Sequence, residues 1–420
     1  MSENSIDQLL GFSRDHQDQL TVMTQTLVGA FSANPPGDIS KVAAAAVDII
    51  QRTIPSAEVR TYESARGITN VVAIVRGSGP GKRLVFSGHL DTYPLGNEAS
   101  WEFTPLGGRL SDDGKRLYGR GAADMKGGIA ASIMAVRALA EHRGAWNGEV
   151  VLALAGDEET MGTLGSEYLL ENVEVVRGAD AIICGDAGSP LVVRIGEKGL
   201  VWIEVHARGV SAHGAHVHKG ANAIERLVEA ITALKALEKL PVSAPKEVDE
   251  VISTAKPVSE RLSGTGEEDT LKRITVNIGT ISGGTSPNLV PDSAQFEADI
   301  RLPMGISTSY ILEHIHEHLD PLDGISFRIT REYDPTWTSP TEKIVRYALD
   351  AAKSIVDQDT VLNMRVGASD SRLFRRRNIP TVVLGLTPYN MGGPDEYLVI
   401  EELCQVAQIH TMTAFNFLSK

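Results

Sequence analysis

Cysteine is scarce in this sequence. Only Cys184 and Cys404 occur among 420 residues, and they lie far apart in the chain. A disulfide framework and a cysteine-based zinc site both need several closely spaced cysteines. The sequence therefore excludes both kinds of site and favours a reducing, cytoplasmic compartment.

Long apolar runs are also absent. Residues 1–20 are polar and acidic and lack the apolar core of a signal peptide. No run elsewhere reaches the roughly 18 apolar residues that a membrane span requires. We therefore expect no membrane association.

Positive charge is in deficit. Lys and Arg total 40 against 54 Asp and Glu, which gives a formal net charge of −14. Nucleic-acid surfaces need clustered Lys and Arg to neutralise phosphates, so no nucleic-acid partner is expected. The one dense basic cluster, Arg375–Arg377, is short. We interpret it first as a solvated helix face and second as a local anion site.

The order of predicted elements indicates an α/β protein of two domains. Between Lys82 and Cys184, short β-branched runs alternate with helical stretches, as in parallel strands joined by crossover helices. From about Gly199 the order is strand, helix, strand, strand, which indicates an α+β insert, and alternation resumes near Gly305. We predict a doubly wound, mostly parallel sheet formed by residues 1–198 and 308–420, with residues 199–307 as the insert.

A histidine and an aspartate follow the predicted strand within LVFSGHLDTYP. His89 and Asp91 are two residues apart, so on an extended strand their side chains face the same way and the carboxylate can orient the imidazole. One interpretation is a metal-bound histidine with its carboxylate partner. The other is a loop histidine beside a capping aspartate.

Acidic residues stand at three further element ends. Asp124 follows a glycine-rich turn before an Ala-rich helix, either as an N-cap or as a metal-bridging carboxylate. Asp157, Glu158 and Glu159 follow the strand EVVLALAG, and Asp186 follows DAIIC. Adjacent acids raise each other's proton affinity unless a cation is present. The alternative for the triplet is a solvated acidic turn.

These element ends share one edge of the predicted sheet, where α/β proteins bind their ligands. One histidine with several carboxylates suits zinc, manganese or cobalt. One glutamate can bind the metal while its neighbour removes a proton from metal-bound water. The pattern predicts a hydrolytic metal centre.

Eight segments carry a wider pattern, in this order: SGHLDTYP, GRGAADMKGG, GDEETMGTLGS, ICGDAG, GVSAHGAHVHKGANAI, TVNIGTISGGTSPNLVPD, ADIRLP and GGPDEYLVIEEL. In these segments, which span nearly the whole chain, the sequence resembles the co-catalytic metallopeptidase family. That family includes aminoacylases, glutamate carboxypeptidases, acetylornithine deacetylases and succinyl-diaminopimelate desuccinylases.

The resemblance implies a role for each residue of the centre. Glu158 would be the general base and Asp91 the partner of His89. The implied ligands are His89, Asp124 and Asp186 around one metal, with Glu159 at a second metal that Asp124 bridges.

The resemblance also implies that the insert is a lid that mediates dimerisation, so we expect at least a homodimer. His213 would polarise the scissile carbonyl, often from the partner subunit. Asn277 and Arg301 would grip a small substrate, since the planar guanidinium suits a carboxylate. Outside this family context, the same two residues would be a strand-edge asparagine and a surface arginine.

The sequence departs from the family at one position. The family closes its second metal site with a histidine three residues before the aspartate of a C-terminal Asp-Glu pair. Counted back from Asp395, that position is Gly392, and no histidine lies between His318 and His410. We therefore expect one firmly specified metal at His89, Asp124 and Asp186 and a doubtful second one.

The expected activity is hydrolysis of a carbon–nitrogen bond in a small carboxylate-bearing substrate, of the N-acyl amino acid deacylase or carboxypeptidase type. An alternative is an aminohydrolase that releases ammonia from an electron-poor aromatic amino acid such as a substituted aminobenzoate. Outside hydrolysis of carbon–nitrogen bonds, the remaining alternatives are a non-catalytic ligand-binding descendant, an esterase and a zinc-dependent binding module.

Overall fold

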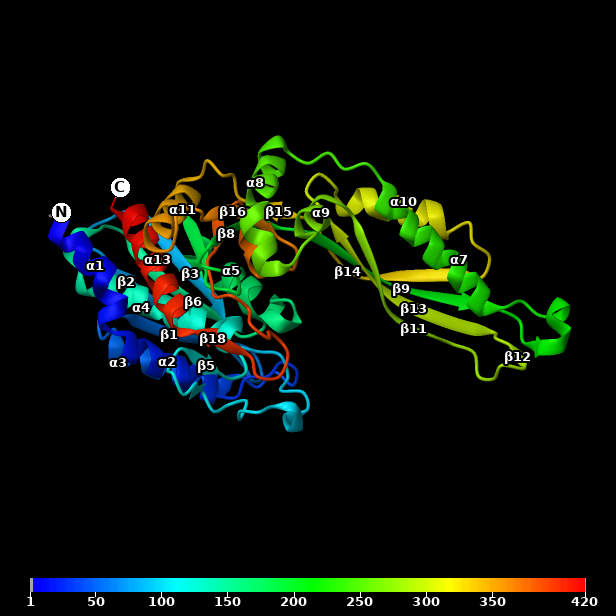
Figure 1. Cartoon of the computed structure of the whole chain (residues 1–420), viewed down its shortest axis with the longest axis horizontal. Helices are drawn as coiled ribbons and strands as arrows, with labels where there is room; N and C mark the ends of the chain where they lie inside the picture. Colours follow the sequence, from blue (N-terminus) through cyan, green and yellow to red (C-terminus); the bar gives the residue numbers. More distant parts are fainter. Residues whose placement is uncertain (1–2, 420) are drawn as a thin grey trace.

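A computed structural model describes residues 3–419; Met1, Ser2 and Lys420 lie outside the described residues. Figure 1 shows a larger body, which contains both ends of the chain, and an elongated arm. Each part is built on its own sheet.

The larger body contains a nine-stranded sheet in the order β1-β2-β6-β3-β7-β17-β8-β15, with β16 paired to β8. The central strands β6, β3, β7 and β17 are parallel, and β1, β2 and β15 pair antiparallel at the edges. The predicted parallel centre is confirmed. The strands are β1 (Glu58–Ala65), β2 (Ile68–Arg76), β3 (Arg83–His89), β6 (Glu149–Ala155), β7 (Ala181–Cys184), β8 (Val192–Glu197), β15 (Thr336–Trp337), β16 (Val361–Arg365) and β17 (Thr381–Val383).

Helices cover both faces of this sheet because its strands are apolar on both sides. Leu84 and Phe86 face the core cluster that contains α4 and α13, whereas Val85 of the same strand faces the cluster of α5, α6 and α12. The helices of the first face are α1 (Glu3–Asp15), α2 (Gln17–Gly29), α3 (Ser40–Thr53), α4 (Gly127–Glu141), α11 (Lys343–Ile355) and α13 (Ile400–Leu418). Those of the second are α5 (Tyr168–Asn172), α6 (Glu174–Arg177) and α12 (Ser371–Arg376).

The arm is a four-stranded antiparallel sheet in the order β11-β13-β9-β14, with two helices packed on one face (Figure 1). Its last strand, β14, pairs with β9, so the arm extends to residue 333 rather than ending at residue 307 as expected. Conversely, α8 (Lys246–Ser263) lies inside the expected insert but packs on β16 of the larger body. The arm elements are β9 (Gly199–Arg208), α7 (Ala223–Ala236), β11 (Thr275–Gly283), β13 (Ser293–Leu302), α10 (Thr308–Leu319) and β14 (Ile325–Tyr333).

Smaller elements complete the described chain. A three-stranded sheet, ordered β18-β5-β4, packs against α13 and against the turn of residues 122–126 that precedes α4, and the two-stranded β10-β12 ribbon lies in the arm. Among residues 3–419, no helix has both the length and the apolar character of a membrane span. These smaller elements are β4 (Arg109–Leu110), β5 (Arg116–Tyr118), β10 (Ala212–His213), α9 (Glu267–Lys272), β12 (Leu289–Val290) and β18 (Tyr397–Val399).

The interpretation of Arg375–Arg377 as a solvated helix face is wrong for its first residue. Arg376 and Arg377 are exposed, but Arg375, which belongs to α12, is buried. Its guanidinium lies 3.3 Å from Oε2 of Glu197, with which it forms a buried ion pair. A charged side chain tolerates this burial because its partner is charged and hydrogen-bonded as well.

Candidate active site

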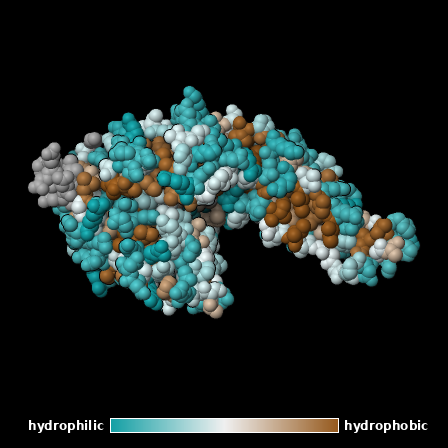
Figure 2. All heavy atoms as spheres, in the orientation of Figure 1, coloured by the Kyte–Doolittle hydropathy of each residue, from teal (hydrophilic) through white to brown (hydrophobic). Residues whose placement is uncertain are grey.

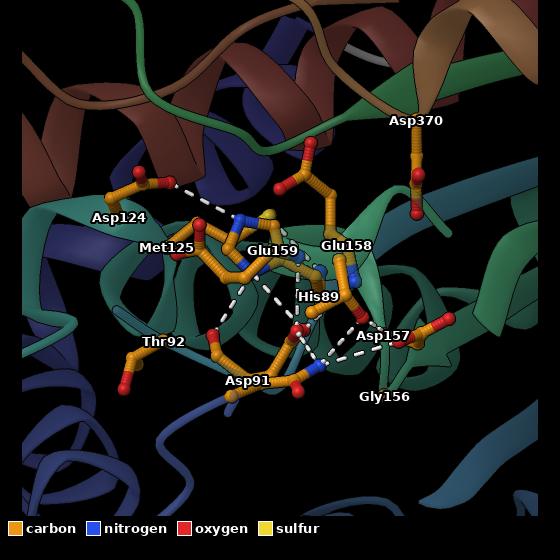
Figure 3. A network of polar contacts seen from close by, with 12 residues as sticks. His89, Asp91, Thr92, Asp124, Met125, Gly156, Asp157, Glu158, Glu159 and Asp370 are labelled. Carbon is orange, nitrogen blue, oxygen red and sulfur yellow. Dashed lines mark hydrogen bonds and ion pairs between the residues drawn. The ribbon is translucent and has the colours of Figure 1, made fainter. Parts of the chain in front are cut away.

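His89 ends β3 and is buried, with 3% of its surface exposed. Its Nδ1 lies 3.0 Å from the carbonyl oxygen of Asp91, and since a carbonyl only accepts, Nδ1 carries the proton. Nε2 faces Oδ1 of Asp124, 3.2 Å away (Figure 3). Burial lowers the pKa of the imidazole, but its contacts with Asp124 and Asp91 outweigh this effect and raise the pKa well above its usual value.

The carboxylate of Asp91 holds the neighbouring acidic turn in place. Oδ1 accepts a hydrogen bond from the amide of Glu158 at 3.1 Å, and Oδ2 accepts one from the amide of Glu159 at 3.0 Å. Oδ2 also accepts from Nδ2 of Asn34 at 3.0 Å. Asp91 lies 3.6 Å from Nδ1 of His89, so it supports the imidazole and both glutamates together.

Asp124 does not cap the helix that follows it. It lies in the irregular turn η2 (Ala122–Lys126), before the start of α4, and its φ and ψ of −126° and 93° are not helical. The amides of Ala123 and Asp124 donate to Oε1 of Glu396 at 3.1 and 3.3 Å, and Arg120 holds Glu396 at 2.7 Å. The turn therefore presents the Asp124 carboxylate to His89 instead of to the helix amides.

Glu158 and Glu159 occupy the turn η4 (Glu158–Thr160) after β6, and both are half-buried rather than solvated. Burial raises the pKa of Glu158 well above its usual value, and the nearby Asp370 and Asp186 add to that effect. Burial together with the charge of Asp124 raises the pKa of Glu159 to about 9. Burial thus disfavours two negative charges in this turn, and a cation bound there would favour the charged form of both acids.

Asp186 follows β7 and completes a compact set. One ligand atom from each of His89, Asp124 and Asp186 lies within 4.8 Å of the others, and His89 forms a second such set with Glu158 and Glu159. Oδ2 of Asp186 also accepts a hydrogen bond from Arg365 at 2.6 Å. The structure thus brings together all six residues predicted for the metal centre: His89, Asp91, Asp124, Glu158, Glu159 and Asp186.

These donors fit a divalent metal. Oε1 of Glu159 is buried and has no hydrogen-bond partner among the described residues, although buried carboxylate oxygens normally have one. Nε2 of His89 and Oδ1 of Asp124 face one another 3.2 Å apart in the same place, and both atoms can bind a metal. Imidazole with carboxylates is a suitable set for zinc, manganese or cobalt.

The three predicted residues of the arm lie apart from this set. His213 is exposed on β10, which pairs with β12 at the far end of the arm (Figure 1). Asn277 is exposed on the edge strand β11. Arg301 is half-buried on β13, and its Nε donates to both carboxylate oxygens of Asp299 at 2.8 and 2.9 Å.

The position where the family has a histidine, Gly392, has space for a side chain. Gly392 has a φ of +74°, and a Cβ built there would meet only the ring of Tyr93, at 3.7 Å. Arg120 donates to the carbonyl of Gly392 at 2.9 Å, which ties this loop to the Glu396–Asp124 contact. Burial, together with the charges of Glu159 and Asp124, raises the pKa of the Tyr93 phenol to about 12.

Sequence reasoning missed Arg365 and Asp370. Arg365 contacts Asp186 directly, and Asp370 is only 4% exposed and lies to the right of Glu158 in Figure 3. Burial raises the pKa of Asp370 to about 6. Both residues flank the loop after β16, so the rule that ligands gather at the carboxyl ends of strands would have found them.

Comparison with known proteins places this geometry in a family. The model of peptidase family M20/M25/M40 matches residues 85–416. The succinyl-diaminopimelate desuccinylase of Rhodospirillum centenum is 26% identical over 348 residues, which cover 82% of this chain and 83% of that enzyme. The desuccinylase of Sphingopyxis alaskensis is 29% identical over 351 residues, covering 82% and 83%.

Solved structures share the fold over nearly the full length. An M20 metallo-carboxypeptidase from Sulfolobus solfataricus superposes with a TM-score of 0.75 at 20% identity, covering 96% of this chain and 98% of the other. Human carnosine dipeptidase 1 gives a TM-score of 0.73 at 17% identity, covering 99% and 100%. The chain therefore belongs to peptidase family M20/M25/M40 and is a metal-dependent hydrolase that acts on carbon–nitrogen bonds.

Proposed function

We propose that this enzyme hydrolyses an amide bond in a small substrate that bears a carboxylate, such as an N-acyl amino acid or a short peptide. The observation that carries the proposal is the position of Glu158 in the same compact set as His89 and Glu159, with its carboxyl free to exchange a proton. Its relatives include a desuccinylase, a carboxypeptidase and a dipeptidase, and these names describe amide hydrolysis and support the proposal.

Within this proposal each residue has a separate task. His89, Asp124 and Asp186 would hold the principal metal, and Glu159 would contribute to a second, weaker position. A metal bound there would supply an activated water. The carboxylate of Glu158 would accept a proton from the attacking water and pass it to the leaving nitrogen, while Asp91 fixes the positions of His89 and Glu158.

The metal itself is proposed as zinc, manganese or cobalt, with one firmly bound ion per chain. The second position has Glu159 and Asp124 but Gly392 where the family has a histidine. A related Bacillus subtilis protein of the family is described as a dinuclear metal-binding peptidase. We propose that the site of the present chain is uneven and differs from that arrangement in this respect.

The arm is proposed to act as a lid and as the interface of at least a dimer. Figure 2 shows apolar side chains gathered on the arm and near its tip. Monomeric proteins rarely leave such patches uncovered. The exposed apolar residues of the arm are Val210, Val217, Ile224, Val228, Ile281 and Leu289.

His213 depends on this interface. It lies at the far end of the arm from the acidic set of its own chain (Figure 1), so we propose that it polarises the scissile carbonyl in the partner's active site. Asn277 and Arg301 are proposed to contact the substrate from the lid. Size-exclusion chromatography that finds only monomers would remove His213 from this role.

A second candidate is release of ammonia from an electron-poor aromatic amino acid. The observation that favours it is Gly392, because an altered metal site suits a reaction other than routine peptide cleavage. Both candidates begin with the same deprotonated water and differ in their products. An aminohydrolase releases ammonia, whereas a deacylase releases an amine and an acid.

The test is a panel of N-acyl amino acids, dipeptides and aminobenzoates incubated with the metal-loaded enzyme, with separate detection of ammonia and of free amino acid. Glu158→Gln serves as the inactive control. Free amino acid without ammonia from the acyl substrates is the expected result. Ammonia from an aminobenzoate alone would replace the first candidate by the second.

A further inference from the structure

Arg365 places a fixed positive charge beside the metal ligands. It ends β16, and its Nη1 lies 2.6 Å from Oδ2 of Asp186, as in a strong, charge-assisted hydrogen bond. The side chain of Arg365 is 17% exposed and that of Asp186 is 3% exposed. The contact uses only one oxygen of Asp186.

Most of the donors of Arg365 remain unused. A guanidinium has five N–H groups, and among the described residues only Nη1 of Arg365 has an acceptor. Its Nε and Nη2 are not sealed off either, because neither is among the fully buried polar atoms that lack a partner. Arg365 thus donates one hydrogen bond to Asp186, and its Nε and Nη2 groups remain available to a ligand.

Neighbouring buried arginines differ in this respect. Arg194 donates to Glu267 and to the carbonyl of Met364, and Arg375 contacts Glu197 and the carbonyl of Thr381. Each of these guanidiniums is shared between two acceptors of the fold. The partial pairing of Arg365 is therefore a local feature of the active site, not a general property of the buried ion pairs.

Building on the proposed function, we propose that Arg365 binds the carboxylate of the substrate at the metal centre and thereby sets specificity. A carboxylate bound to the open donors must lie about 3 Å from them and hence close to Asp186. This geometry selects substrates whose carboxylate is only two or three bonds from the nitrogen of the cleaved bond. N-acyl α-amino acids and ortho-amino aromatic acids form this class.

Arg301 is less suited to that position. It lies on the arm, and its Nε is committed to both oxygens of Asp299. A carboxylate on the arm side would be held away from Asp186, at the distant end of a longer substrate. The two arginines therefore predict different substrates, which makes them a matched pair for experiment.

The test measures binding to the manganese-loaded Glu158→Gln protein by isothermal titration calorimetry. The probes are N-acetyl-L-methionine with its carboxamide, and 2-aminobenzoate with 4-aminobenzoate. We expect the acid to bind roughly ten- to a hundredfold more tightly than its amide, as for a charge-assisted hydrogen bond. We expect the same difference between the ortho and the para isomer. When Arg365→Met is combined with Glu158→Gln, both preferences should disappear. When Arg365→Lys is used instead, part of the preference for the acid over the amide should remain.

Adding Arg301→Met should leave both preferences intact. The inference is overturned if Arg365→Met, folded by circular dichroism and loaded with metal, keeps them, or if Arg301→Met removes them. Equal binding of the ortho and para isomers to the Glu158→Gln protein with its native Arg365 would also overturn the inference. Turnover by the wild-type enzyme is assayed separately. If the probes bind with an Arg365-dependent preference but are not hydrolysed, the proposed function is refuted and the role of Arg365 in binding stands.

Discussion

The carboxylate of Asp91 accepts a hydrogen bond from the backbone amide of Glu158 at 3.1 Å, so the candidate general base is positioned by a residue on a different strand end. The same carboxylate accepts the amide of Glu159. The position of the acidic turn therefore depends on one buried side chain, which leads to the first prediction.

Asp91→Asn should lower kcat by about ten- to a hundredfold and destabilise the fold by about 1–3 kcal/mol, because one amide of the turn would face an NH2 group instead of an acceptor. Steady-state kinetics and urea unfolding measure the two effects. Asp113→Asn, in an exposed turn, is the control and should change neither by a comparable amount. Wild-type kcat in Asp91→Asn would contradict the positioning role.

Glu158→Gln should lose about two to four orders of magnitude in turnover and retain metal and fold, because it preserves size but cannot accept a proton. Kinetics, metal analysis and circular dichroism give the three readouts. Glu171→Gln removes an acid from α5, outside the metal set, and should behave as wild type. Near-normal turnover by Glu158→Gln would assign the base to another residue.

Metal content should respond to Gly392. The wild-type protein is expected to retain one tightly bound metal per chain, and Gly392→His to retain two, because a side chain at this position meets only an ordinary contact with Tyr93. The positive φ makes the substitution cost about 1 kcal/mol of stability. Elemental analysis after gel filtration measures the ratio.

Gly393→His places the same ring one residue further along the loop and should retain one metal. Two tightly bound equivalents in the wild-type protein would show that another group already replaces the histidine.

Acid stability should depend on His410. This residue of α13 is buried, its Nε2 lies 2.7 Å from the carbonyl of Leu384, and burial lowers its pKa to about 4. Between pH 6.5 and 4 the unfolded chain binds a proton at this ring that the folded protein does not. Its contribution to stability is therefore complete above pH 6.5 and is lost as the pH falls, by about 2 kcal/mol at pH 5.

Urea unfolding of the wild type and His410→Gln at pH 7 and pH 5 isolates this effect. The loss of unfolding free energy between the two pH values should be smaller in the variant by that amount. Equal losses in both proteins would show that His410 is already protonated in the fold.

The metal centre was accessible from sequence because its residues follow apolar runs, and strand ends of a parallel sheet meet at one edge. His89 and Asp186 illustrate this. The arm boundary was not accessible, because the alternation in β14 identifies a strand but not its partner β9. Arg375 was misjudged for a similar reason, because Glu197, the partner that it contacts when buried, is distant in sequence.

Glu396 has a consequence for how the protein is made. Its carboxylate holds the amides of Ala123 and Asp124, which precede it by more than 270 residues. During synthesis the arm and most of the large body emerge before this residue does. The turn that carries Asp124 therefore lacks its support until residue 396 has been made, and we expect nascent chains that stop before Glu396 to be inactive.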